Sequence, residues 1–146
     1  MIITNLNSDL QILAQFLAKT YFPKKNVAIT AKEVLKELNN KLDGFNERFR
    51  TTFKSPIKET QFREMINFIR SNNLVKDGEL VAGSNGYYIT NDRDEVLRQI
   101  ESLEGRISSI KNAIEGMRKN VSKYQIVKKK MTYDKKPLDG DLFDNL

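Results

Sequence analysis

The chain has 146 residues, of which 39% are hydrophobic, and it contains no Cys, His or Trp. This length suits one folded domain with an appendage. The missing Cys and His exclude thiol and imidazole catalysis and nearly all zinc sites. A net charge of +6 favours an anionic partner such as nucleic acid.

The charge is unevenly placed along the chain. Residues 1–91 carry a net charge of +4, residues 92–122 of 0, residues 123–136 of +5 and residues 137–146 of −3. Within the first block, basic side chains concentrate between Arg48 and Arg63. The sequence therefore holds two basic patches, which are separated by a neutral stretch and followed by an acidic end.

Neither a membrane span nor a signal peptide is indicated. No segment approaches 18 consecutive apolar residues. The N-terminus lacks the basic region followed by an apolar run that marks a secretory signal. We therefore expect a cytoplasmic protein, in a bacterium or an infected host cell, with no membrane partner.

Two amphipathic helices are predicted in the first third of the chain. The first covers residues 8–22, where apolar residues recur at spacings of three and four, and Pro23 ends it. Thr30 and Glu33 form a capping box, in which each side chain satisfies a backbone amide of the other residue. This box predicts the start of the second helix, which ends by Asn40.

Residues 41–54 are less regular and predict a turn followed by a short helix or structured loop. Ser55-Pro56 then predicts the start of a third helix, because Ser caps helices and Pro suits the first helical position. This helix runs to about Asn72. Its apolar stripe consists of Phe62, Met65, Ile66 and Ile69.

Two short β-prone runs follow, at Glu79–Ala82 and Tyr87–Thr90. The four residues between them, Gly83–Gly86, predict a β-hairpin. The order helix, helix, helix, hairpin is typical of a winged helix-turn-helix, whose third helix enters the DNA major groove while the hairpin lies along the backbone. We therefore predict an α+β, mostly helical fold with a winged-helix domain over residues 1–91 and a two-stranded wing.

The stretch from Ser55 to Ile114 also resembles small winged-helix proteins encoded by phages and mobile elements. In these proteins the third helix runs into a short wing that ends in a Gly-Tyr-Tyr-Ile-like strand, and a long helix with a Leu-x-x-Arg-Ile-like repeat follows. The resemblance covers roughly residues 27–120, and its sharpest part is Gly86-Tyr87-Tyr88-Ile89-Thr90 leading into Asp92. It implies DNA binding without enzymatic activity.

A long coiled-coil helix is predicted over residues 92–124. Apolar side chains alternate at spacings of four and three for about four heptads, which is the pattern of a coiled-coil seam. The seam begins at Val96, ends at Tyr124 and otherwise consists of Ile100, Leu103, Ile107, Ile110, Ile114, Met117 and Val121. Either it joins two copies of the chain or it packs on the first helix of the same chain.

Flanking charges indicate the geometry of a dimer. Parallel pairing would set Arg106 against Lys111 of the partner, which is a like-charge contact. Antiparallel pairing centred near Lys111 would set Glu104 against Arg118 instead. We expect an antiparallel homodimer if the chain dimerises through this seam.

The predicted contacts to double-stranded DNA fall into three groups. Cationic and hydroxyl groups suited to phosphate are Arg48, Arg50, Thr51, Lys54, Lys58 and Arg63. The early positions of the third helix, which reach base edges, are Thr60, Gln61, Arg63, Glu64 and Asn67. Asn85 lies at the tip of the wing. The alternative is that this basic face is only solvated.

Residues 125–146 are predicted to form a flexible tail, first basic and then acidic. Lys128, Lys129 and Lys130 suit nonspecific phosphate binding, or they serve only solubility. Leu142 and Phe143 resemble the end of the short peptide by which bacterial proteins bind the replicative sliding clamp. A different partner, or a chain end that folds back on its own domain, is the alternative.

No enzymatic constellation is recognised. Asp92, Asp94 and Glu95 cluster, but acidic residues are favoured at a helix N-terminus by its dipole. We therefore predict a non-enzymatic DNA-binding protein without metal or cofactor, which acts as a dimer in control of transcription or replication. The alternative is a module that inhibits or recruits a host protein through the helical seam or the Leu142-Phe143 tail.

Overall fold

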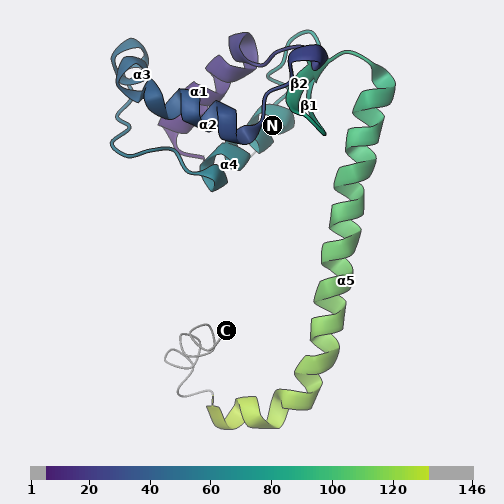
Figure 1. The fold of residues 1–146 in the computed structure, drawn as a ribbon. Coiled ribbons are helices and arrows are strands. Elements are labelled where there is room, and N and C mark those ends of the chain that lie inside the picture. Colours follow the sequence, from purple (N-terminus) through teal and green to yellow (C-terminus); the bar gives the residue numbers. More distant parts are fainter. Residues whose placement is uncertain (1–5, 132–146) are drawn as a thin grey trace. The chain divides into compact units, whose positions relative to one another are not determined.

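A computed structural model describes residues 6–131, with the side chains of residues 122 and 125–131 left aside. The described chain is mostly helical and contains one two-stranded antiparallel sheet (Figure 1), which confirms the α+β prediction at that level. The chain divides into two compact units, Met1–Ile100 and Glu101–Leu146. Among the described helices, none is both long and apolar enough to cross a membrane.

The first predicted helix forms as helix α1, Ser8–Phe16, followed by a π-helical turn, η1, at Leu17–Tyr21. The side chain of Asn7 caps α1 by accepting the backbone N–H of Leu10 at 2.9 Å. The chain turns extended at Phe22, just before Pro23, where the helix was expected to stop.

Helix α2, Ala31–Asn40, begins at the predicted capping box. Thr30 Oγ1 accepts the N–H of Glu33 at 3.2 Å, and Glu33 Oε1 accepts the N–H of Thr30 at 3.0 Å. Helix α3, Leu42–Phe49, follows after one residue and is the short helix expected in this segment.

Helix α4, Glu59–Ser71, begins three residues later than Ser55-Pro56 predicted. The cause lies outside the segment, because the side chain of Asn39 in α2 bonds both backbone groups of the buried Ile57, at 2.7 and 3.2 Å. Ile57 is thereby kept out of the helix. The N–H of Lys58 is then accepted by the Gln61 side chain at 2.8 Å, which completes the helix start.

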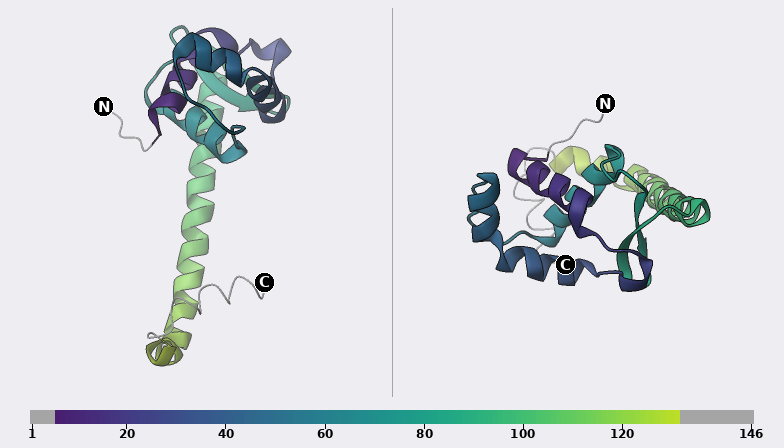
Figure 2. Two further views of the ribbon diagram at one scale, coloured as in Figure 1. Left: turned by 90° about the vertical axis from the view of Figure 1, so that its left-hand side faces the viewer. Right: turned by 90° about the horizontal axis from the view of Figure 1, so that it is seen from above.

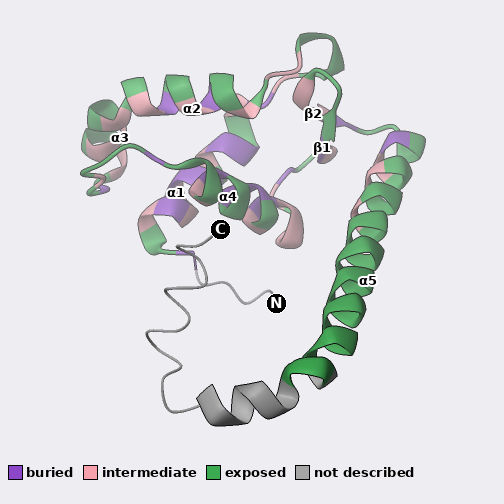
Figure 3. Ribbon diagram, turned by 60° about the horizontal axis from the view of Figure 1, so that its bottom comes forward, coloured by how far each residue is buried: buried purple, intermediate pink, exposed green. Residues whose placement is uncertain are grey.

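The hydrophobic core lies among α1, α2, α4 and the sheet (Figure 2). The apolar stripe of α4 is confirmed as its buried face: Phe62, Met65, Ile66 and Ile69 are all at most 4% exposed. Figure 3 shows that α1, α2 and α4 each have buried residues on one face and exposed residues on the other. The side chains that pack around the stripe include Leu10, Leu13, Leu17, Val34, Leu38 and Leu80.

Strands β1, Glu79–Gly83, and β2, Gly86–Thr90, form the predicted hairpin. Its turn has two residues, Ser84 and Asn85, where a four-residue connection was expected, because Gly83 and Gly86 themselves pair. The other edge of β2 is also paired: Ile29 and Tyr87 exchange two backbone hydrogen bonds, of 3.0 and 2.7 Å. The segment before α2 therefore extends the sheet beside β2.

Helix α5, Arg93–Met131, is capped by Asp92, whose Oδ1 accepts the N–H of Asp94 at 2.9 Å. Residues 125–131 continue the helix, where a flexible tail was expected. No Pro or Gly interrupts this stretch, and Lys, Gln and Met are good helix formers. Leu142 and Phe143 lie outside the described residues.

Gly86 is where the hairpin packs most closely on the rest of the domain. Its φ of +121° is a conformation that side chains rarely adopt, and an added Cβ would lie 2.4 Å from the backbone of Ile29. We expect Gly86→Ala to lower the free energy of unfolding by about 2–4 kcal/mol, from backbone strain and overpacking. Chemical denaturation followed by circular dichroism measures this.

Gly44→Ala is the matched control, because nothing lies within 4 Å of a Cβ added at Gly44 in α3. It should raise stability by about 0.5–1 kcal/mol, as expected for Ala in an exposed helix position. Equal effects of the two substitutions would contradict the close approach of Gly86 to Ile29.

Candidate nucleic-acid interface

The exposed face of α4 is opposite its buried stripe. Because Phe62, Met65 and Ile69 point into the core, the helical period turns the remaining positions outward. Most of the predicted base-contacting side chains are exposed there, namely Thr60, Arg63, Glu64 and Asn67. Gln61 is different, since it is half-buried and its oxygen is already used by the N–H of Lys58.

The charges on this face of α4 nearly balance. Arg63 lies 3.3 Å from Glu59 one turn earlier, and both side chains are largely exposed. Such an exposed pair contributes only about 0–1 kcal/mol, so it leaves Arg63 free to exchange partners. Within α4, Glu59 and Glu64 balance Arg63 and Arg70, so attraction for a polyanion must come from residues that precede α4.

The loop before α4, residues 50–58, carries three exposed cations, Arg50, Lys54 and Lys58. Asn46 of α3 holds its first part, because its Oδ1 accepts the N–H of Phe53 at 2.9 Å and its Nδ2 donates to the Phe53 oxygen at 2.8 Å. The loop is thus held by partly buried hydrogen bonds, while its cations are exposed to solvent.

Two further hydrogen bonds join the same loop to the start of α1. Asp9 Oδ2 accepts both the N–H and the hydroxyl of Thr52, at 2.9 and 3.0 Å. Arg50 begins the loop with φ of +58°, a left-handed conformation that ends α3. Three elements, α1, α2 and α3, therefore position this basic loop.

Two of the predicted phosphate contacts are placed differently from expectation. Thr51 is only 5% exposed and its hydroxyl donates to Asn46 at 2.8 Å, so it belongs to the loop anchor and not to the surface. Arg48 is exposed, but its guanidinium lies over the rings of Phe16 and Phe49, at 5.4 and 5.0 Å from their centroids. This cation–π stacking holds Arg48 on α1.

Asn85 is exposed at the hairpin turn. The hairpin is joined to α4 by Arg70, whose Nε donates to the Leu80 oxygen at 2.9 Å. The rings of Phe62 and Tyr87 also pack in a T-shaped pair, with centroids 5.5 Å apart. The hairpin and α4 thus belong to one packed unit.

Glu95 has a structural role that the sequence reading missed. It is only 8% exposed, and it accepts hydrogen bonds from Tyr88 at 3.0 Å and Thr90 at 2.6 Å. Lys25 Nζ lies 2.5 Å away. The bond from Lys25 has the largest effect and the bond from Thr90 the next largest, and together these bonds lower the pKa of Glu95 to about 2. An acid at a helix start is ordinary, so nothing in the sequence distinguished it.

Gln99, one turn after Glu95, continues the attachment of α5 to the hairpin. Its side-chain oxygen accepts the backbone N–H of Ala82 at 2.6 Å and an N–H of Arg70 at 3.1 Å. The first two turns of α5 therefore fold with the hairpin. The first compact unit accordingly extends to Ile100.

The heptad seam of α5 is largely exposed, as Figure 3 shows for most of the described helix. Leu103 is half-buried, and the other six predicted dimerisation residues are 44–68% exposed: Ile100, Ile107, Ile110, Ile114, Met117 and Val121. The apolar face of α1 is meanwhile buried against α4.

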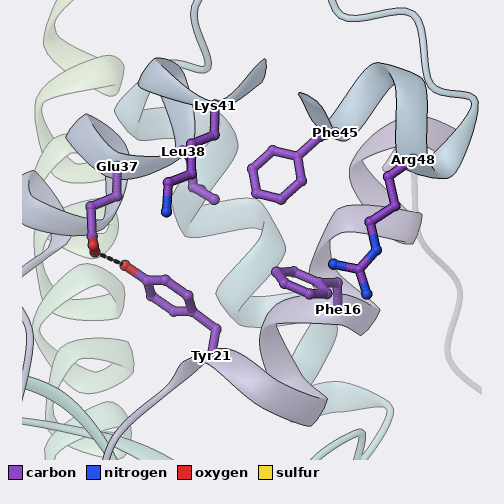
Figure 4. Close-up of a pocket in the computed structure, with 7 residues that line it drawn as sticks. All are labelled: Phe16, Tyr21, Glu37, Leu38, Lys41, Phe45 and Arg48. Carbon is purple, nitrogen blue, oxygen red and sulfur yellow. Dashed lines mark hydrogen bonds between the residues drawn. The ribbon is translucent and has the colours of Figure 1, made fainter. Parts of the chain in front are cut away.

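A pocket of about 210 Å³ lies between α1, η1, α2 and α3 (Figure 4). Its walls are mainly Phe16, Leu38 and Phe45. The Tyr21 hydroxyl donates to Glu37 at one side, and burial followed by this bond raises the pKa of Tyr21. The charged side chains of Glu37, Lys41 and Arg48 also line the pocket.

Among the residues that the structure describes, no three acidic side chains gather closely enough to hold a metal ion. Comparisons with protein-family models, with curated proteins and with solved structures find no match to this chain. The functional argument therefore depends on the geometry of the molecule.

The network around Glu95 predicts a pH dependence of stability. A pKa lowered from 4.5 to about 2 means that the folded state favours the ionised carboxylate. Its stabilising contribution is complete above pH 4.5 and is lost as the pH falls towards 2. We expect Glu95→Gln to be less stable than the parent at pH 7 and to lose less stability over this acid range. Thermal unfolding at a series of pH values measures both effects.

Glu101→Gln is the control, since Glu101 is an exposed carboxylate on the same helix. It should leave the acid-range loss close to that of the parent chain. If Glu95→Gln and Glu101→Gln gave the same pH profile, the assigned role of Glu95 would be wrong.

Proposed function

We propose that the first unit is a winged helix-turn-helix module that binds double-stranded DNA without catalysing a reaction. In this proposal α4 is the recognition helix and the β1–β2 hairpin is the wing. The protein acts in the cytoplasm in control of transcription or replication. A phage or mobile-element origin is suggested by the resemblance described above.

The arrangement of elements supports this proposal. In a winged helix, three helices are followed by a hairpin, and the third helix presents its outer face to DNA. Here α1, α2 and α4 surround one core, and the hairpin follows α4 directly. Ile29, between α1 and α2, pairs with Tyr87 of β2, which adds a third extended segment beside the wing. Helix α3 is an additional element between α2 and α4.

The observation that carries the proposal is the division of α4 into two faces. One face is fully buried, and the opposite face presents Thr60, Arg63 and Asn67 to solvent. These are side chains with the donors and acceptors to read base edges: Arg pairs bidentately with guanine and Asn with adenine. The exposed pair with Glu59 is weak enough to yield Arg63 to such a contact.

The basic loop would supply the contacts to the DNA phosphates. Arg50, Lys54 and Lys58 are exposed on a backbone that Asn39, Asn46 and Asp9 hold in place. Cations on a fixed backbone neutralise phosphates with little loss of entropy, and they position the protein without reading sequence. This would place phosphate contacts directly before the recognition helix.

A protein-interaction module is the second candidate. It is favoured by the exposed apolar seam of α5, since contiguous apolar surface of this kind commonly marks an interaction site. Such a module would inhibit or recruit a host protein through the seam or through Leu142 and Phe143. The two candidates differ in whether DNA binds the chain at all.

The test is binding of the full chain to a random-sequence duplex, followed by fluorescence anisotropy across a salt series. We expect the Lys58→Ala/Arg63→Ala variant to bind about tenfold more weakly at low salt. It should also reduce the slope of log K against log salt by about 1–2, because two phosphate or base contacts are removed.

Lys32→Ala/Lys36→Ala removes the same charge from exposed positions on α2 and is the matched control. It should change affinity much less than the α4 variant. Equal losses of affinity in both double variants would show that DNA binding depends only on overall charge. If the parent chain did not bind DNA at low salt, the protein-interaction module would be favoured.

A further inference from the structure

Helix α5 carries an apolar surface whose length suits another helix. From Ile100 to Tyr124 the seam spans about 36 Å, at about 1.5 Å per residue. Its exposed side chains are large, with Ile107 at 63%, Ile110 at 60% and Met117 at 68%. Gly105 and Gly116 lie outside the seam and have nothing within 4 Å of an added Cβ, so they do not interrupt it.

We propose that the occupant of this seam is a second copy of the chain, paired antiparallel about a two-fold axis near residue 112. In that register the first core residue of each heptad (100, 107, 114 and 121) meets the second core residue (124, 117, 110 and 103) of the partner copy. The layers from the ends to the centre are Ile100 with Tyr124, Leu103 with Val121, Ile107 with Met117, and Ile110 with Ile114. Every layer is apolar, and the described seam from Ile100 onward is used in full.

In this register the charges beside the seam of one copy are complementary to those of the other copy. Glu104 faces Arg118 of the other copy, and the symmetry makes this attraction twice. Lys111 meets its own copy near the axis, and Glu115 one turn along each helix offsets that like-charge contact. On the other flank Ala113 meets Ala113, so no bulky side chain separates the helices at the axis.

The competing arrangements are less favourable. In a parallel pair Arg106 faces Lys111, and no attractive pair compensates within the described flanks. A register one heptad closer to the start of α5 would need Val96 as a layer residue. Val96 is already half-buried and lies beside Glu95, which is bonded to Tyr88 and Thr90. The centre near residue 112 leaves these contacts intact.

The chain has no Cys, so single cysteine variants report the register directly. On mild oxidation of the full chain, Ala113→Cys should form a covalent dimer, because residue 113 meets its own copy at the axis. Asn112→Cys is the matched control, since residue 112 lies on the outer side of the helix and should stay monomeric on a denaturing gel. Cross-linking of Ile110→Cys but not of Ala113→Cys would show a parallel pair and overturn the proposal.

Charge exchange tests the same register without cross-linking, by sedimentation equilibrium of the full chain. Glu104→Arg alone and Arg118→Glu alone should each weaken dimerisation about tenfold, because two attractions become repulsions. The double variant should recover the parental affinity to within about twofold. Circular dichroism should show unchanged helix content, since both positions are exposed.

A chain that stays monomeric over the full concentration range would overturn self-association, and failure of the double variant to recover would overturn the register. Neither measurement involves DNA. The result is therefore independent of the proposed DNA binding, and either proposal can fail without the other.

Discussion

The burial of one face of α4 is the constraint on which the rest of the first unit depends. Phe62, Met65 and Ile69 fill the space between α1, α2 and the hairpin, and Phe62 also contacts Tyr87 of β2. A helix packed so firmly on one side has only its polar side left for a partner. The same burial therefore stabilises the fold and determines which residues of α4 remain available to a partner.

Polar side chains, in turn, hold the segments that the core does not reach. Asn39 bonds both backbone groups of Ile57, Asn46 bonds those of Phe53, and Glu95 joins α5 to β2 and Lys25. A backbone group taken from water needs such a partner. Among the described residues no buried side-chain nitrogen or oxygen lacks one. The basic loop is thus ordered by the polar network, while its cations remain available.

Unlike the first unit, α5 beyond Ile100 offers large apolar side chains to solvent at heptad spacing. Exposed seams of this kind gain stability by pairing, because burying apolar surface is the main favourable term in association. The two proposals assign different kinds of recognition to different parts of the chain. Polar groups on α4 and its loop suit a charged partner, and the apolar seam suits a second copy.

The sequence by itself determined the features that depend on neighbours within a few residues: the presence and order of the helices, the Thr30–Glu33 capping box, the buried stripe of α4, the hairpin and the heptad period of α5. Only the tertiary structure decided where α4 begins, that Thr51 is an anchor, that Arg48 stacks on Phe16 and that Glu95 holds a network. Each of these depends on a partner from another element, such as Asn39 for Ile57 or Lys25 for Glu95. Helical and hairpin patterns repeat at short range and can be read along the chain, whereas a hydrogen bond between distant residues leaves no periodic signal in it.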